Sequence, residues 1–535
     1  MLNAIIFVTG AAILALELLA SRILAPYFGV SLYIWSGILS ITLISLASGY
    51  WAGGKIAHGS KGARQSTTLT LLFALMPAIA AIAIVASCLA YPYLFYALAR
   101  MDLVFGAFIA CLVLLFVPLL ATSAMNPLLV AILLRQKDEG GGLADAGAGR
   151  VFFISTLGSV AGVFVTAFGI IPFLSNFAAT LVVAVTLATL SLILLMLKST
   201  RLEKRKSLAV TTGIALVSSI AALAGADYYT GRMWPVSHGD TGWSHEASYR
   251  SMFGTVKVLR SNPMNNRKFL RIYFQDGLIQ NVVDSDNHST SMYTYALEAL
   301  SLAYRPEPQS ALVLGIGAGM VPMRLANYGI AVTAVDIDPA SLRAASEVFG
   351  LERDKVRVHE ADARTFLQSC ASAYHVIVVD LFHGDGVPDY LITREFFRDL
   401  GRCLAPDGVA IFNTFADLDA PRTYAHFLTT LRSELPYVMV HRPDHASARH
   451  INSFVVASAR PLPAPATVDL RHVPAQHLDT LSQLLRTPIP LNQRLLDQGR
   501  VATDARNILS RDMSASQLVY RRHVVDALPA AFFVN

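Results

Sequence analysis

The chain has little cysteine and little charge for its length. Only four cysteines occur in 535 residues, none of them in a CxxC pair, and Cys88 and Cys111 lie in long apolar runs. This usage excludes a disulfide framework and gives no support for a zinc site. Charged residues make up 15% of the chain and hydrophobic residues 54%, and the mean hydropathy is +0.49. These values indicate a membrane part and more than one domain.

The apolar excess lies almost wholly before residue 227. Seven runs there approach the roughly 20 apolar residues that a hydrocarbon core requires, namely 3–24, 33–56, 67–90, 103–133, 151–173, 176–197 and 208–226. The first lacks a cationic leader and a cleavage site, so we interpret it as a retained span. The fourth is overlong and contains Pro118 and Asn126-Pro127, so we expect it to be kinked or partly re-entrant. The sequence predicts an all-α, multi-pass transmembrane bundle over residues 1–229, in the cell inner membrane.

Residues 311–338 contain the clearest ligand-binding pattern. Ala311–Leu314 predicts a buried strand that runs into three glycines, a helix follows over 320–328, and a second strand ends at Asp336. Nucleoside-cofactor folds are built this way, because glycine lets the backbone approach a ligand at a helix N-terminus and the acid accepts hydrogen bonds from ribose hydroxyls. The GxGxG spacing of Gly315, Gly317 and Gly319 favours an adenosylmethionine-type ligand over a dinucleotide. The alternative is a tight turn without a ligand.

The globular half, residues 230–535, alternates further strands and helices. Such alternation predicts an α/β Rossmann-like, doubly wound sheet of the methyltransferase type over 310–460. The last two strands, 438–443 and 451–458, suggest a reversed edge hairpin. Before this sheet we expect a small β-hairpin subdomain over 250–285, and after it a tail over 461–535.

The three strands that follow the glycine turn end in carboxylates, namely Asp336 with Asp338, Asp362, and Asp380. In such sheets ligands bind beyond the carboxyl ends of the strands, so these side chains should meet in one pocket. The alternative, that the acids only cap the following helices, fits Asp338 well and Asp362 in part. Asp380 follows an apolar strand, and a carboxylate there can hold an amine and accept its proton, so we assign it as the catalytic base. We expect no metal, because no His/Cys/Glu cluster occurs.

Positive charge gathers in three of the short loops between the apolar runs. The opposite loops offer little beyond Arg22 and Arg100. The positive-inside rule then places the N-terminus and the three basic loops in the cytoplasm, and the net charge of +6 reflects this orientation rather than nucleic-acid binding. Seven complete spans would put the globular half outside, whereas free thiols and an adenosyl ligand belong in the cytoplasm. Either the seventh run does not cross fully or the ligand reaches the far side; the sequence slightly favours a cytoplasmic globular half.

Both halves resemble known proteins. ELLASR, APYFG and GYWAGGK resemble the opening of the membrane-fused spermidine synthase-like proteins, and residues 250–415 are similar to spermidine synthases. The resemblance implies that QDGLIQ places Gln280 near the cofactor, VDIDP places Asp336 on the ribose, and EADAR (Asp362 and Ala363) holds the adenine amino group. VVDLFHGDGVP would be the gate loop with Asp380 as base, and VATDARNILSRD the closing tail motif with Asp504 retained.

This sequence departs from the family pattern at the amine end of the ligand. Ala318 stands where the family has an acid, His383 where the gate loop has a second acid with Asp385 displaced by two, and Ala505 where the tail motif has its second Asp. Tyr293 could supply part of a substrate pocket, as could His383, Asp385 and Asp504, although core packing explains Tyr293 equally well.

The leading hypothesis is a membrane-bound aminopropyltransferase that moves an aminopropyl group from decarboxylated S-adenosylmethionine to an amine. One alternative is a methyltransferase or lyase that uses intact S-adenosylmethionine, which Ala318 favours by leaving room for a carboxylate. The other is a transporter or sensor with a non-catalytic nucleoside-binding domain. As partners we expect the lipid bilayer and a small amine, with a homodimer left open, and no nucleic acid.

Overall fold

The computed structural model describes the chain except for residues 1, 31, 60–62, 138–143, 197–201, 264–267, 382–387, 418–420 and 444–449. It divides into two compact units. The helical unit comprises Met1–Val236 together with Val524–Asn535, and the globular unit comprises Ser237–His523.

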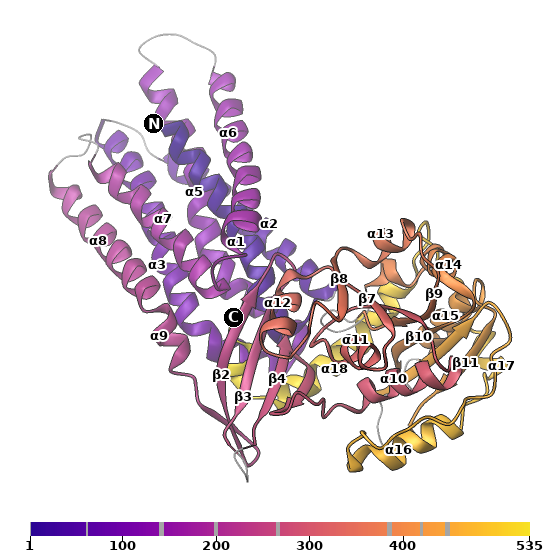
Figure 1. The fold of residues 1–535 in the computed structure, drawn as a ribbon. Helices are drawn as coiled ribbons and strands as arrows, with labels where there is room; N and C mark the ends of the chain where they lie inside the picture. Colours follow the sequence, from indigo (N-terminus) through magenta and orange to yellow (C-terminus); the bar gives the residue numbers. More distant parts are fainter. Residues whose placement is uncertain are drawn as a thin grey trace. The chain divides into compact units, whose positions relative to one another are not determined.

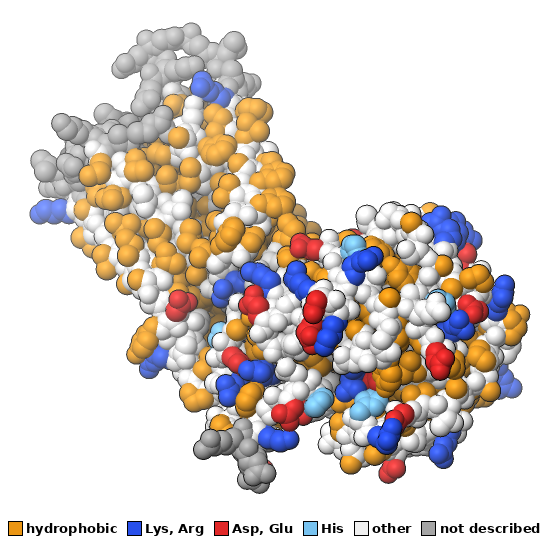
Figure 2. All heavy atoms as spheres, in the orientation of Figure 1, with side chains coloured by type: hydrophobic (Ala, Val, Ile, Leu, Met, Phe, Trp, Pro, Cys, Tyr) orange, Lys and Arg blue, Asp and Glu red, His pale blue; other side chains and the backbone are white. Residues whose placement is uncertain are grey.

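The helical unit is a bundle of long apolar helices (Figure 1). Its elements are α1 (Leu2–Phe28), α2 (Leu32–Gly59), α3 (Ala63–Met101), α4 (Leu103–Cys111), α5 (Val117–Lys137), α6 (Ala144–Phe164), α7 (Asn176–Met196), α8 (Leu202–Ala224) and the short α9 (Ala226–Gly231). Among the described residues seven helical stretches are long and apolar enough to cross a membrane, which confirms the seven apolar helices expected from the sequence. Figure 2 shows the matching surface, on which hydrophobic side chains cover the bundle. Leu43, Trp51 and Val217 are more than 60% exposed there.

The fourth span is one helical stretch, Leu103–Leu134, in which the winding changes midway. A π-helical segment, η1 (Leu112–Phe116), separates α4 from α5 and directly precedes Pro118. Proline has no N–H to continue the regular α-helical bonding, and a π-bulge is one way in which a helix accommodates this loss. The stretch is therefore a continuous helix with a local irregularity shortly before the proline, at the place where the sequence predicted a departure from a regular helix.

A five-stranded antiparallel sheet opens the globular unit. It consists of β1 (Val236–His238), β2 (Thr241–Arg250), β3 (Thr255–Ser261), β4 (Leu270–Gln275) and β5 (Leu278–Asp284), paired in sequence order. The hairpin expected from the alternating pattern is β3–β4, and the strands β1 and β2 add to it on one side. Asp276 and Gly277 have φ of 47° and 88° and form the tight turn between β4 and β5 that the Asp-Gly pair predicted.

A seven-stranded sheet in the order β11-β12-β10-β9-β6-β7-β8 follows. Its strands are β6 (Ser310–Leu314), β7 (Ala331–Asp336), β8 (Val356–Glu360), β9 (Tyr374–Val379), β10 (Leu404–Asp417), β11 (Tyr437–His441) and β12 (His450–Ser458). Strands β6 to β10 pair in parallel, and β12 runs antiparallel between β10 and β11. This order confirms the methyltransferase-type sheet and its reversed edge hairpin.

Helices cover both faces of this sheet, because the strand side chains alternate between two cores. Val313 packs into the core under α10 (Met292–Tyr304), α11 (Met320–Asn327), α12 (Pro339–Glu347) and α16 (Ala475–Arg486). Leu312 packs into the core under α13 (Ala363–Gln368), α14 (Arg394–Cys403) and α15 (Pro421–Arg432). The sheet is therefore buried on both sides, and a ligand can reach it only at its ends.

The end of the chain belongs to the helical unit, although the sequence placed 461–535 wholly in the globular half. After α17 (Gln493–Leu496) and α18 (Leu509–Ala527), the short α19 (Ala530–Phe533) packs against α3. The rings of Phe533 and Tyr27 lie 5.7 Å apart, and Phe532 and Phe533 are fully buried. The main-chain oxygen of Asn535 accepts a hydrogen bond of 3.0 Å from the N–H of Phe177. Local periodicity could not predict this placement, because it depends on contacts between residues hundreds of positions apart.

Candidate adenosyl-ligand site

A cavity of about 620 Å³ lies in the globular unit at the carboxyl ends of β6, β7 and β9. Its wall includes nine of the residues that the sequence singled out: Gln280, Tyr293, Gly315, Gly317, Asp336, Asp338, Asp362, Ala363 and Asp380. The glycine turn and the three acidic strand ends are thus brought to one place, as the parallel topology requires. This volume suits a small organic ligand that is largely enclosed by protein.

The glycine turn after β6 permits a close approach between neighbouring segments. Gly315 has φ of +88°, and a Cβ atom there would overlap the main-chain carbonyl of Asp380. Gly317 has φ of +51°, lines the cavity, and has open space where a Cβ would stand. Gly319 has φ of +79°, begins α11 as its N-cap and does not line the cavity. The first glycine is therefore required by packing and the second leaves room for a ligand.

Asp336 lies at the tip of β7 and holds the glycine turn in place. One carboxylate oxygen accepts the N–H of Ile316 at 2.9 Å, and the other accepts the N–H of Asp338 at 2.9 Å. Burial raises the pKa of Asp336 to about 6, although these two backbone donors act in the opposite direction. Each carboxylate oxygen can accept a further hydrogen bond, so Asp336 can bind hydroxyl donors from the cavity while it orders the turn.

Asp338 and Asp362 are helix caps as well as cavity residues. Asp338 accepts the N–H of Ala340 at 2.8 Å and the side-chain amide of Gln275 at 3.1 Å. Asp362 caps α13 through the N–H of Thr365 at 2.9 Å, and its second oxygen accepts the hydroxyl of Tyr390 at 2.9 Å. The capping alternative is correct for both acids. It does not exclude a ligand role, because both residues also line the cavity.

Asp380 follows β9 and is held by an amide relay. The side-chain amide of Asn413 on β10 donates to its carboxylate at 2.9 Å, and the amide of Asn452 on β12 donates to Asn413 at 3.1 Å. Burial raises the pKa of Asp380, the Asn413 bond lowers it and the negative charge of Asp336 raises it, and together they bring this pKa to about 6. Asp380 is therefore ionised near neutral pH, yet its pKa is close enough to accept a proton readily.

Tyr293, on α10, closes the cavity beside Gln280. Its hydroxyl donates to the main-chain oxygen of Gln280 at 3.2 Å and accepts the side-chain amide of Asn281 at 3.2 Å. Burial, assisted by the charge of Asp380, raises the pKa of Tyr293 well above its usual value of 10.0. The hydroxyl therefore stays protonated and cannot act as the base.

The cavity wall is acidic without compensating positive charge. Among the residues that the structure describes, no Lys or Arg side chain lines it. Ala318 does not line it either; this residue is buried in a core with Tyr273, Met320 and Phe349. The room for a carboxylate that we expected beside Ala318 is therefore filled by packed side chains. Such a wall favours a ligand with positive charge.

Besides Gly319, three predicted residues are not placed in the cavity. Asp504 lies on the surface, where its carboxylate pairs with Arg364 and its N–H donates to Glu395 at 3.0 Å. It fastens the tail to α13, next to the cavity residue Ala363. His383 and Asp385 lie outside the described residues.

Sequence reasoning missed Asn413, Asn452 and Tyr390. Asn413 carried a usable signal, because it is the first polar residue after four apolar ones in β10. Phe412 pairs with Val379 in the parallel register, so the following residue, Asn413, lies beside Asp380. Asn452 and Tyr390 carried no comparable signal. The position of Asn452 depends on the antiparallel pairing of β12 with β10, and that of Tyr390 on the short 3₁₀ helix Asp389–Leu391.

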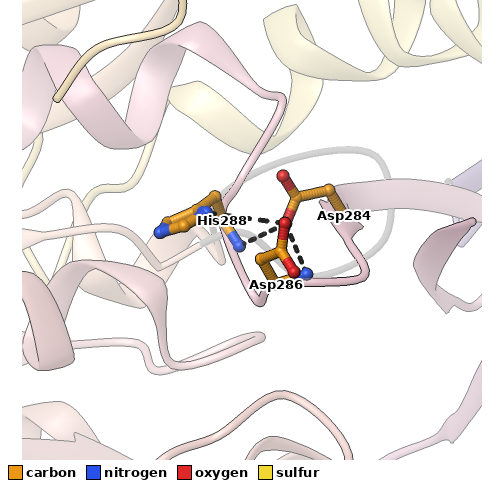
Figure 3. Close-up of side chains that lie close together, drawn as sticks. All are labelled: Asp284, Asp286 and His288. Carbon is orange, nitrogen blue, oxygen red and sulfur yellow. Dashed lines mark hydrogen bonds and ion pairs between the residues drawn. The ribbon is translucent and has the colours of Figure 1, made fainter. Parts of the chain in front are cut away.

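A second acidic group lies apart from the cavity wall. Asp284 ends β5, Asp286 and His288 follow it, and ligand-type atoms of the three side chains lie within 4.8 Å of one another (Figure 3). One Asp284 oxygen accepts the N–H groups of Asp286 and His288 at 3.0 and 2.8 Å, and Lys268 pairs with Asp286 at 3.2 Å. Lys268 offsets the negative charge of Asp286, and the two backbone hydrogen bonds to Asp284 stabilise the turn that precedes α10. We therefore assign the cluster a structural role.

Comparison with known proteins addresses the chemistry of the cavity. The family described as spermine/spermidine synthase domain matches residues 290–437, a range that contains eight of the nine predicted cavity residues. The globular half contains a spermine/spermidine synthase domain. This domain holds the glycine turn, the acidic strand ends and the first two-thirds of the sheet.

Curated relatives are similar to a part of the chain. A polyamine aminopropyltransferase of Vibrio vulnificus is 33% identical over 138 residues, which are 25% of this chain and 45% of the relative. Polyamine aminopropyltransferase 2 of Hyperthermus butylicus is 27% identical over 263 residues, 44% of this chain and 82% of the relative. An N-terminal histidine N-methyltransferase of Emericella nidulans is 36% identical over 132 residues, 24% of this chain and 23% of the relative. The chain thus spans less than half the length of two of these three relatives.

Proposed function

We propose that the protein is a membrane-bound aminopropyltransferase. It would transfer the aminopropyl group of decarboxylated S-adenosylmethionine to a small amine, with the synthase domain as its catalytic part and the apolar helices as its anchor in the cell inner membrane. The observation that carries this proposal is the cavity wall, where Asp336, Asp362 and Asp380 converge without a basic side chain among the described residues. The names of two relatives, polyamine aminopropyltransferases, agree with this choice.

The proposed residue roles follow from the position of each group. The cavity face of Asp336 would accept the ribose hydroxyls, and Asp362 with Ala363 would hold the adenine amino group, since they lie at or just after the ends of β7 and β8, the two strands beside β6 on one side of the glycine turn. The glycine turn would lie against the ligand because Gly317 leaves open space there. Asp380 stands at the remaining end of this row, where the sulfonium carbon and the amine would meet.

The reaction needs a nucleophile, a leaving group and a proton acceptor. The amine nitrogen attacks the aminopropyl carbon bonded to sulfur, the new C–N bond forms, and the C–S electron pair returns to sulfur. The products are the aminopropylated amine and neutral methylthioadenosine. Asp380 would accept the amine proton, and a carboxylate with a pKa of about 6 is suited to that step. Asn413 would keep the carboxylate oriented toward the amine.

Intact S-adenosylmethionine fits this cavity less well. Its extra carboxylate would meet Asp380 and Asp336 with no Lys or Arg of the described wall to balance it, and like charges at short range in a buried site are costly. The similarity to a histidine N-methyltransferase nevertheless makes methyl transfer the second candidate.

Product analysis separates these functions. Purified full-length protein in detergent would receive decarboxylated or intact S-adenosylmethionine, each with and without putrescine or another small diamine. Methylthioadenosine that forms only from the decarboxylated compound, and only with an amine, supports the proposal. Adenosylhomocysteine would indicate a methyltransferase, and methylthioadenosine without any amine would indicate a lyase. Ligand binding without either product would leave a sensor or transporter domain as the function.

A further inference from the structure

The two ends of the helical unit differ strongly in charge. In the sequence, the α2–α3, α5–α6 and α7–α8 connections and the helix ends next to them contain eleven basic residues: Lys55, Lys61, Arg64, Arg135, Lys137, Arg150, Lys198, Arg201, Lys204, Arg205 and Lys206. The other end carries Arg22, Arg100 and Arg232. In membrane proteins an excess of Lys and Arg in short loops marks the cytoplasmic side, so the first end should face the cytoplasm.

The seventh span crosses the whole bundle, which the sequence alone left open. α8 is an unbroken helix of 23 residues that packs against both α7 and α3. Midway along it, the Thr212 hydroxyl lies 2.8 Å from the Ser191 hydroxyl of α7, which also bonds the main-chain oxygen of Ala74 on α3. Directly after α8, the Tyr229 hydroxyl donates to the main-chain oxygen of Leu89 at 2.6 Å. The chain therefore leaves the helical unit at the end opposite the basic connections.

The chain also re-enters the helical unit at that same end. The hydroxyl of Tyr96, near the C-terminal end of α3, donates to the main-chain oxygen of Leu528 at 3.0 Å, and Arg100 pairs with Asp526 at 3.5 Å. The N–H of Phe177, at the start of α7, donates to Asn535. Figure 1 shows α9 and the C-terminus together at one end of the bundle, with the N-terminus at the other. The globular unit is thus connected at both its ends to one side of the bundle.

We infer that the globular unit, with its adenosyl-ligand cavity, lies on the extracytoplasmic side of the membrane. This inference rests on the part of the proposed function that places the helices in a membrane, but not on the aminopropyl chemistry. It reverses the cytoplasmic position that the sequence favoured. An adenosyl ligand would then have to reach the cavity outside the cytoplasm, through the bundle or by a separate exporter.

The cysteines of the globular unit do not oppose this location. Cys403 is fully buried, and Cys370, which contacts it, is half-buried with its thiol directed to the main-chain oxygen of Ser372 at 3.1 Å. Burial shields the Cys403 thiol from soluble oxidants. For the location of the globular unit, the free thiols are therefore weaker evidence than the difference between eleven and three basic residues.

Cysteine labelling provides a matched test. Gly149 on α6 and Gly231 on α9 lie at opposite ends of the helical unit, both are exposed, and a Cβ at either would meet nothing within 4 Å. Arg471, whose side chain is 90% exposed, reports on the globular unit. The variants Gly149→Cys, Gly231→Cys and Arg471→Cys would be made singly in the full chain. A C-terminal reporter fusion is unsuitable, because Phe532 and Phe533 are buried in the bundle.

Each variant would be treated with a membrane-impermeant maleimide in intact spheroplasts and again after detergent permeabilisation. The parent chain provides the background from its own thiols. We expect Gly231→Cys and Arg471→Cys to label fully before permeabilisation and Gly149→Cys to label at least tenfold more after it. The reverse pattern, or Arg471→Cys labelling together with Gly149→Cys, overturns the inference. Recovery of the chain in the soluble fraction would overturn its membrane premise, whereas the product assay above tests the chemistry separately.

Discussion

The Asn413 side chain holds the Asp380 carboxylate through a hydrogen bond of 2.9 Å across neighbouring parallel strands. Among the described residues this hydrogen bond lowers the pKa of Asp380, while burial and the charge of Asp336 raise it. Asn452 extends the relay from the antiparallel strand β12. The relay thus links residues of the parallel strands β9 and β10 and of the antiparallel strand β12. The orientation of the Asp380 carboxylate therefore depends on all three strands.

Replacing Asp380 should separate chemistry from binding. We expect Asp380→Asn to lower kcat by about 10²–10⁴-fold, because the proton acceptor is lost. Affinity for the adenosyl ligand should change little, since the shape of the side chain is retained. Steady-state kinetics and calorimetric titration would measure the two effects. Glu352→Gln, which removes a surface partner of Lys355, is the control and should match the parent. Unchanged turnover in Asp380→Asn would remove it from the role of base.

The Asn413 bond should be visible in the pH dependence of the reaction. Turnover needs ionised Asp380, so kcat/KM should rise with pH through about 6. Asn413→Ala removes a bond that lowers this pKa, so the acidic limb should move to higher pH. Asn452→Ala should cause a smaller shift in the same direction, because it acts through Asn413. Profiles that coincide with the parent would show that the relay does not act on the base.

The buried charge of Asp380 should cost stability at neutral pH. Its folded pKa of about 6 lies above the usual 3.8, so the folded state binds more protons between these two values, and the charge penalty grows as pH rises from about 3.8 and is complete once pH has risen through 6. Asp380→Asn removes this penalty, and we expect its Tm to exceed that of the parent by a few degrees at pH 7.5. The difference should shrink toward pH 4.5, where Asp380 is largely protonated in the folded state. Thermal melts in detergent would measure it; a constant difference would contradict the linkage.

The first two glycines of the turn should respond differently to substitution. Gly315→Ala brings a Cβ into the Asp380 carbonyl at a φ of +88°, so both the melting temperature and turnover should fall sharply. Gly317→Ala meets open space, so its stability cost should be only the roughly 1–2 kcal/mol of left-handed strain. Because Gly317 faces the cavity, this variant should chiefly weaken ligand affinity. Equal loss of stability in both variants would contradict the proposed division of roles.

The acidic strand ends could be predicted because parallel strands deliver their carboxyl ends to one edge of a sheet. Asp336, Asp362 and Asp380 needed only strand periodicity and the direction of pairing to be placed together. The dual use of Asp338 and Asp362 as caps was equally local. Ala318 was misjudged, because its side-chain direction depends on how the turn packs against Phe349 and Tyr273.

By itself the sequence determined the seven apolar spans, the charge asymmetry of their connections, and the order of strands that ends in the acidic cavity. These features depend on composition and on hydrophobic patterns with a period of a few residues, both of which can be read from the sequence. Only the tertiary structure decided that α8 is unbroken and packs against α7 and α3, that Phe533 packs against Tyr27, and that Asn413 supports Asp380. Each of these depends on contacts between segments that are distant in the sequence. Local patterns are compatible with several arrangements of such segments, and packing and hydrogen bonding determine which one forms.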